Sequence, residues 1–208
     1  MDTTRNDAEG VETIIDENTP HKFSSPWHFS DVVLDVEGTK FHVHRSTLSM
    51  WSPVFQTMFT SQFLERTANE IPLPGKRANE VEQLLKVIYS DDAKQEVKKT
   101  NYEFLLELAR EYQMDKVLQH CGQYMKQGTN KRNCLHRYKI AERFGFEDVM
   151  EKCNEEARFK PSYELEGSAD FNDLGFESKF KLCMARIKEL EKALTKYVYT
   201  CSDLVSDA

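Results

Sequence analysis

The sequence predicts an α+β fold in which a small sheet near the N-terminus precedes a succession of helices. Residues 32–36 are mostly β-branched and nearly continuous in apolar character, as in a buried strand. Residues 39–43 alternate between apolar and polar, as in a half-buried strand, and Gly38 between the two runs favours a tight turn. From Asn101 onward, apolar residues recur at helical spacing. We therefore expect a β-hairpin followed by a mainly helical chain.

Composition limits the class of protein. The 208 residues are 39% hydrophobic and 30% charged, which suits one medium domain with appendages or two small domains. The net charge of -7 disfavours binding to nucleic acid, because phosphates repel an acidic surface. No apolar run is long enough to predict a membrane span. The five cysteines are odd in number and far apart, which favours reduced thiols in the cytoplasm or nucleus; they are Cys121, Cys134, Cys153, Cys183 and Cys201.

Several shorter elements are expected between the hairpin and Asn101. Ser46 is suited to cap a short helix, and Ser52-Pro53 supplies a cap and a first helical residue for another. Residues 70–74 contain two prolines and are typical of a short edge strand. Residues 79–89 carry an amphipathic pattern that predicts a helix.

Residues 1–28 are expected to form a disordered acidic tail. They carry six acidic residues and two basic ones, with few apolar side chains between them. Such a segment buries too little apolar surface to offset the entropy lost on ordering. Structure is therefore predicted to begin near Phe29.

An internal repeat organises the helices after Asn101. Five residues recur 32 positions later: Ala109, Tyr112, Met114, Val117 and Cys121 correspond to Ala141, Phe144, Phe146, Val149 and Cys153. Each copy has the pattern of a helix, a short turn and a second helix. Any two helical hairpins share small and aromatic packing positions, and two copies are too few for a solenoid. We interpret the repeat as stacked helical hairpins that extend one core.

The last part of the chain is predicted to be a linker, residues 160–175, followed by a long helix, residues 176–204. Apolar residues of this helix follow heptad spacing, with Phe180, Ile187 and Leu194 at position a and Cys183, Leu190 and Tyr197 at position d. This seam favours a coiled coil between chains or a helix folded back onto its own core. In a parallel dimer, Arg186 and Glu191 would form an ion pair across the seam.

The segment 29–59 resembles the signature of the BTB/POZ family. The matching residues are Ser30-Asp31-Val32, Phe41, His44-Arg45, Leu48, Ser52-Pro53-Val54-Phe55 and Met58-Phe59. The resemblance covers residues 29–127 and is greatest to the BTB domains that accompany MATH domains and their nematode-type relatives. It implies a small mixed sheet capped by helices.

Members of this family usually form two-fold homodimers. The resemblance implies that the helices between Ser46 and Phe59 supply the dimer surface, with these candidate contacts: Asp31, Arg45, Leu48, Trp51 and Phe55. A charge in a partly buried interface is costly without a partner, so Asp31 and Arg45 could pair there. Alternatively they stabilise the protomer, which is the role we favour for Asp31.

Many family members bind the third cullin and act as substrate adaptors of cullin-RING ubiquitin ligases. The resemblance implies a cullin contact at Phe63-Leu64-Glu65, although Phe63 could instead pack within its loop. A helical extension at residues 128–159 resembles the helical pair that adaptors use. The sequence therefore predicts a homodimeric adaptor, and the alternative is an oligomerisation scaffold without a ubiquitin-ligase role.

Signatures of catalysis are not found in the sequence. There is no glycine-rich phosphate loop and no G-x-S-x-G motif. Cys134 and His136 lack a second Cys/His pair at zinc spacing. We predict no catalytic, cofactor-binding or metal-ligating residues, and a protein that is not an enzyme.

Overall fold

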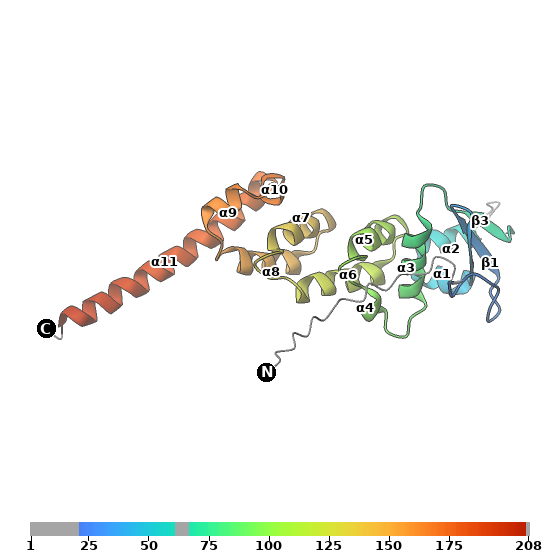
Figure 1. Ribbon diagram of the computed structural model, residues 1–208, viewed down its shortest axis with the longest axis horizontal. Helices are drawn as coiled ribbons and strands as arrows, with labels where there is room; N and C mark the ends of the chain where they lie inside the picture. Colours follow the sequence, from blue (N-terminus) through green and yellow to red (C-terminus); the bar gives the residue numbers. More distant parts are fainter. Residues whose placement is uncertain (1–20, 61–66, 207–208) are drawn as a thin grey trace, which may run out of the picture.

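The sheet lies at one end of the molecule (Figure 1). The computed structural model describes residues 21–60 and 67–206, with side chains described up to residue 197. Strands β1 (Val32–Val36) and β2 (Thr39–Val43) are antiparallel, and β3 (Glu70–Pro72) runs parallel to β1. The strand order β2-β1-β3 puts the proline-containing strand at an edge, where a missing N–H is tolerated. The predicted hairpin and edge strand are thus confirmed.

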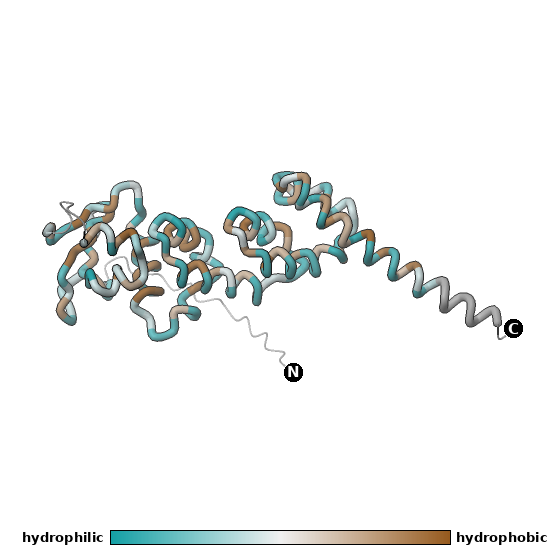
Figure 2. Tube along the Cα trace, turned by 180° about the vertical axis from the view of Figure 1, so that it is seen from behind, coloured by the Kyte–Doolittle hydropathy of each residue, from teal (hydrophilic) through white to brown (hydrophobic). Residues whose placement is uncertain are grey.

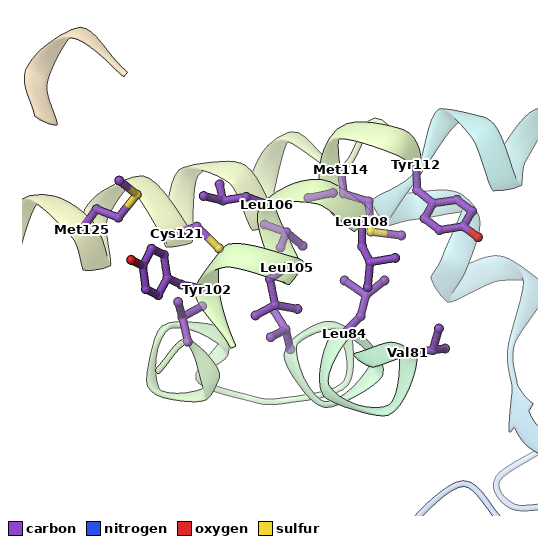
Figure 3. Close-up of a cluster of buried hydrophobic side chains, with 14 of the residues drawn as sticks. Val81, Leu84, Tyr102, Leu105, Leu106, Leu108, Tyr112, Met114, Cys121 and Met125 are labelled. Atoms are coloured by element: carbon purple, nitrogen blue, oxygen red, sulfur yellow. The ribbon is translucent and has the colours of Figure 1, made fainter. Parts of the chain in front are cut away.

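Between the hairpin and residue 127, the described residues form six helices. They are α1 (Arg45–Trp51), α2 (Pro53–Thr60), α3 (Ala78–Ile88), α4 (Ala93–Glu96), α5 (Tyr102–Glu111) and α6 (Asp115–Gln127). Their apolar faces share one core, part of which Figure 3 shows between α3, α5 and α6. Leu84 of α3 and Leu105 of α5 are both buried in it, as their helical spacing predicted.

The two helix starts proposed from serines had different outcomes. The Ser52 hydroxyl accepts a bond from the Phe55 amide, which confirms it as the cap of α2, and donates to the Tyr112 carbonyl at 2.6 Å. Ser46 does not cap α1. That helix begins at Arg45, whose amide donates to a carboxylate oxygen of Asp31. A residue distant in sequence therefore supplies the cap that local spacing assigned to Ser46.

The domain begins earlier than predicted, because part of the expected tail is packed. Phe23 is 0% exposed, and its carbonyl accepts a bond from the His42 amide of β2. The Trp27 indole N–H donates to the His42 carbonyl at 2.8 Å. Residues 21–28 therefore belong to the folded domain, and the expected boundary at residue 29 is wrong. The rest of the expected tail, residues 1–20, lies outside the described residues.

The predicted repeat corresponds to two similar hairpins. Helices α7 (Cys134–Phe144) and α8 (Glu147–Ala157) stack on α5 and α6. In the first turn the Met114 amide donates to the Ala109 carbonyl at 2.7 Å, and in the second Phe146 donates to Ala141 at 2.9 Å. Both turns contain a left-handed residue. The repeat is confirmed as a structural one.

Residues 160–175 are not a linker. They form two short helices, α9 (Ser162–Glu166) and α10 (Ala169–Asn172), and α10 packs on α7. Leu165, Phe171 and Leu174 are buried there. Helices of five and four residues complete too few turns to show periodicity in a sequence.

Helix α11 (Phe176–Ser206) extends away from the stack at the end opposite the sheet (Figure 1). Its first turns pack on α8, with Leu182 only 1% exposed. Along the rest of its described length, hydrophobic and hydrophilic residues alternate on a helix that projects free of the stack (Figure 2). None of the helices in the described part of the chain is long and apolar enough to cross a membrane.

Candidate protein-interaction surfaces

Asp31 and Arg45 lie together at the start of α1. The Asp31 carboxylate accepts a hydrogen bond from the Arg45 amide at 2.8 Å. The Arg45 guanidinium donates to the Ala68 carbonyl at 2.5 Å and lies 4.8 Å from the centre of the Phe59 ring. Asp31 thus satisfies an otherwise unpaired amide at a helix start, which is a role within the protomer. Arg45 joins α1 to α2 and to the residues before β3.

Two of the predicted dimer contacts are not on the surface. Leu48 and Phe55 are 0% and 2% exposed, and Phe55 stacks on Tyr112 with ring centres 4.8 Å apart. Both side chains fill the core of the protomer and are not available to a partner. Trp51 is half-buried, with the Lys116 ammonium 5.4 Å from its ring centre. The family signature marks core positions as well as surface ones, which explains the error.

Two exposed apolar side chains lie close in sequence to these positions. Phe29 is 99% exposed and adopts a left-handed backbone conformation with φ 64°, and Met50 is 73% exposed. A non-glycine residue at positive φ is uncommon and persists where its surroundings enforce it. Met50 could have been found from the sequence, because a residue two positions after buried Leu48 lies on the other side of a helix.

The predicted cullin contacts, Phe63, Leu64 and Glu65, lie outside the described residues. The helix before them, α2, ends at Thr60, and Phe59 near its end is buried. The described chain resumes at residue 67, just before β3. The segment that contains the three residues therefore connects α2 to the edge strand of the sheet.

Arg137 joins the two helical hairpins. Its side chain is buried at the start of α7, where it donates to the Met125 carbonyl of α6 and lies 5.4 Å from the Tyr124 ring centre. A methyl group at Gly128 would lie 2.7 Å from the guanidinium, so alanine there would force this buried group to shift. A charge this deeply buried needs such partners, and they fix α7 on the end of α6.

A polar hollow of about 530 Å³ opens at the same joint. Its lining residues come from α5, α6 and the start of α7, and from the segments before α5 and between α6 and α7: Lys99, Tyr102, Glu103, Tyr124, Asn130, Arg132, Asn133, His136 and Arg137. Partial burial lowers the pKa of His136, but hydrogen bonds to Glu103 and Asp170 outweigh it, so the pKa lies above its ordinary value. The hollow has more basic than acidic side chains.

The thiols within the stack are poorly suited to nucleophilic chemistry. Burial raises the pKa of Cys121 and Cys153 to about 12, and it also raises the pKa of Cys134. A thiol reacts as its thiolate, which these environments disfavour. Within the described ranges, no group of three or more His, Cys, Asp or Glu residues is arranged to hold a metal ion.

Comparison with known proteins identifies the domain. The sequence profile of the BTB/POZ domain matches residues 21–129, more than half of the chain. The chain belongs to the BTB/POZ family. The BTB/POZ match begins at residue 21, in agreement with the burial of Phe23, and ends two residues after α6. The likeness to MATH-associated members stays a prediction.

The curated relatives of this BTB/POZ chain include proteins named for kelch repeats or as kelch-like. Human Kelch repeat and BTB domain-containing protein 12 is 36% identical over 122 residues, which are 59% of this chain and 19% of that protein. Mouse Kelch-like protein 7 is 33% identical over 112 residues, or 54% of this chain and 19% of that protein. The match thus spans about a fifth of the relatives' length. The BTB domain of zebrafish PATZ1 has a TM-score of 0.40 at 22% identity, over 49% of this chain and 79% of that one.

Proposed function

We propose that this BTB protein is a non-enzymatic, homodimeric adaptor that links target proteins to a ubiquitin ligase built on the third cullin. The observation that carries the proposal is the α7/α8 hairpin stacked directly on a BTB/POZ domain. This arrangement resembles the helical pair that cullin-binding members use after the domain. The polar hollow at the joint offers a surface next to that hairpin for a segment of the cullin.

Binding to the cullin tests the adaptor role. Light scattering is measured on the purified chain with and without the N-terminal domain of the third cullin, and a gain in mass is expected. Phe63→Ala combined with Glu65→Ala should weaken binding at least about tenfold, because contact residues at the centre of an interface each cost more than about 1 kcal/mol. Gln56→Ala, on the exposed side of α2, is the matched control. Unchanged affinity in the double variant, or no binding by the unaltered chain, contradicts the proposal.

Homodimerisation is proposed to use the exposed surface at the start of β1 and the end of α1. Exposed Phe29 and Met50 would bury apolar area there, beside half-buried Trp51. Met50→Asp should lower the mass of the assembly, because an unpaired charge in an apolar interface is costly. Gln123→Asp, on the exposed side of α6, should not. Equal masses for the two variants would argue against this surface.

The outward seam of α11 favours a second candidate function, an oligomerisation scaffold with no ubiquitin-ligase role. An assembly that ignores the cullin, and whose mass depends on α11, supports the scaffold. A dimer that gains mass with the cullin supports the adaptor.

A further inference from the structure

Helix α11 has two apolar faces with different surroundings. On one face, Leu182 is buried against α8, and the Ser178 hydroxyl donates to a carboxylate oxygen of Glu142 in α7. On the other face, five large side chains are between 44% and 69% exposed: Phe180, Ile187, Leu190, Leu194 and Tyr197. Contact with the protein's own stack therefore leaves the heptad seam on the surface.

The geometry of the helix makes the two faces compatible. Leu182 and Ser178 occupy positions c and f of the heptad in which Phe180 is a and Cys183 is d. At 3.6 residues per turn, the middle of the c/f face lies roughly 160° around the helix from the middle of the a/d seam. Docking on α8 and pairing along the seam thus use opposite sides of the helix.

We propose that residues 180–197 of α11 pair with the same residues of a second copy of this chain, as a parallel two-stranded coiled coil in register. A strict heptad seam is complementary to itself, which makes a second copy the fitting occupant. Its central layers have Ile187 at a and Leu190 at d, the combination that favours parallel dimers. At 31 residues, α11 is about 46 Å long, and its ion pair from Glu189 to Arg158, the residue after α8, lies near the middle of that length.

Charge placement favours the parallel orientation. Arg186 is at position g and Glu191 at the following e, and these positions face each other between parallel helices in register. One guanidinium nitrogen of Arg186 donates to the Arg158 carbonyl at 3.0 Å, and a guanidinium has five N–H donors. The remaining donors are available to Glu191 of the second copy. Antiparallel helices would pair g with g and e with e, which separates these two charges.

Cys183 provides a test of orientation and register. It is exposed in the protomer and at a d position, so in a parallel pair in register it faces the same cysteine of the second copy. The full chain with Cys201→Ser is oxidised with diamide and run on a non-reducing gel, and peptide mapping locates the bond. We expect a covalent dimer joined at Cys183, and none after Cys183→Ser.

A positional control makes the crosslink specific. Lys192→Cys, in a chain that also carries Cys183→Ser and Cys201→Ser, puts the thiol at position f, away from the seam and exposed. It should crosslink at least about tenfold more slowly, because thiols more than about 7 Å apart at their Cα atoms do not bridge. Equal rates at positions 183 and 192, or no crosslink at Cys183, would overturn the proposal, and another protein would then be the occupant of the seam.

The mass of the assembly provides a second, non-covalent measurement. In a chain that also carries Met50→Asp, which removes the proposed BTB contact, Ile187→Asp combined with Leu190→Asp should lower the mass seen by light scattering from that of two chains to that of one, 24.3 kDa. Lys188→Asp combined with Thr195→Asp places carboxylates at two b positions of the same helix and should leave the mass unchanged. A mass that does not respond to the seam variant contradicts the proposal. Neither measurement uses the cullin, so the outcome is independent of the adaptor role.

Discussion

The hairpins α5/α6 and α7/α8 share a turn but differ in how deeply equivalent residues are buried. Met114 of the first is fully buried, whereas its counterpart Phe146 is half-buried, and Tyr112 is likewise more buried than Phe144. The first hairpin lies between α3 and the second hairpin, while the second contacts short α10 and the start of α11 on its other side. Sequence similarity thus specifies the local turn, and the neighbouring elements decide the burial.

The largest expected effect on the free energy of unfolding concerns the residue after each turn. Met114→Ala should lower the free energy of unfolding by about 3 kcal/mol, because it leaves a cavity in a closed core. Phe146→Ala removes a larger side chain but should cost less, since part of that ring already contacts water. Urea denaturation of the two variants tests this order, and an equal or greater loss for Phe146→Ala would show that the second hairpin is as tightly packed as the first.

Gly122 in α6 and Gly128 directly after it test how tightly the two hairpins pack at their joint. Gly128→Ala puts a methyl group 2.7 Å from the buried Arg137 guanidinium and should cost about 1–3 kcal/mol. Gly122→Ala puts one at an ordinary 3.6 Å from the Phe146 ring, and should stabilise the helix by up to about 1 kcal/mol. The midpoint temperature of thermal unfolding should therefore fall for Gly128→Ala and rise for Gly122→Ala. A shift in the same direction for both variants would refute this account of the joint.

The smallest expected effect is a pH dependence at His136. This residue of α7 bonds Glu103 of α5 and Asp170 of α10, and its pKa is raised in the folded protein. The protonated form is therefore stabilised by folding. This contribution is fully present below the unfolded pKa near 6.5 and is lost as pH rises through the folded value. Because His136 and its two acidic partners are partly exposed, we expect this contribution to the free energy of unfolding to be less than about 1 kcal/mol.

His136→Gln is the control for that titration. In this variant, the part of the stability difference between pH 5 and pH 8 that is due to His136 should disappear. The part that is due to other titrating groups should remain. Denaturation midpoints of both proteins across this range measure the effect. An unchanged difference between the two pH values would mean that His136 does not link the hairpins through its charge.

The elements with long-range periodicity were predictable from the sequence. The hairpin around Gly38, the amphipathic α3 and the duplicated helices all repeat an apolar pattern over enough residues to specify their type. Residues 21–28 were missed because a single buried aromatic, Phe23, has no periodic signal, and the acidic residues that precede it are typical of a disordered segment. Helices α9 and α10 were missed because they are short.

The candidate surfaces were predictable only in part. The family signature located α1 and α2, but Leu48 and Phe55 in that signature proved to be core residues, and exposed Phe29 and Met50 were not identified. A motif records residue types at fixed spacing and does not separate inward from outward positions. The seam of α11 was located from its heptad spacing. The seam is exposed because the helix packs on α8 through Leu182, which lies outside the seam.

The docking of α11 on α8 has a mechanical consequence. The elements of this elongated protein contact mainly their neighbours, so a pull applied between the sheet and the far end of α11 passes through each contact in turn. Few buried side chains, among them Leu182 and Ser178, hold α11 to the stack, whereas α5 and α6 are held by a continuous core. Under tension α11 should therefore detach first, at a force that leaves the BTB domain folded.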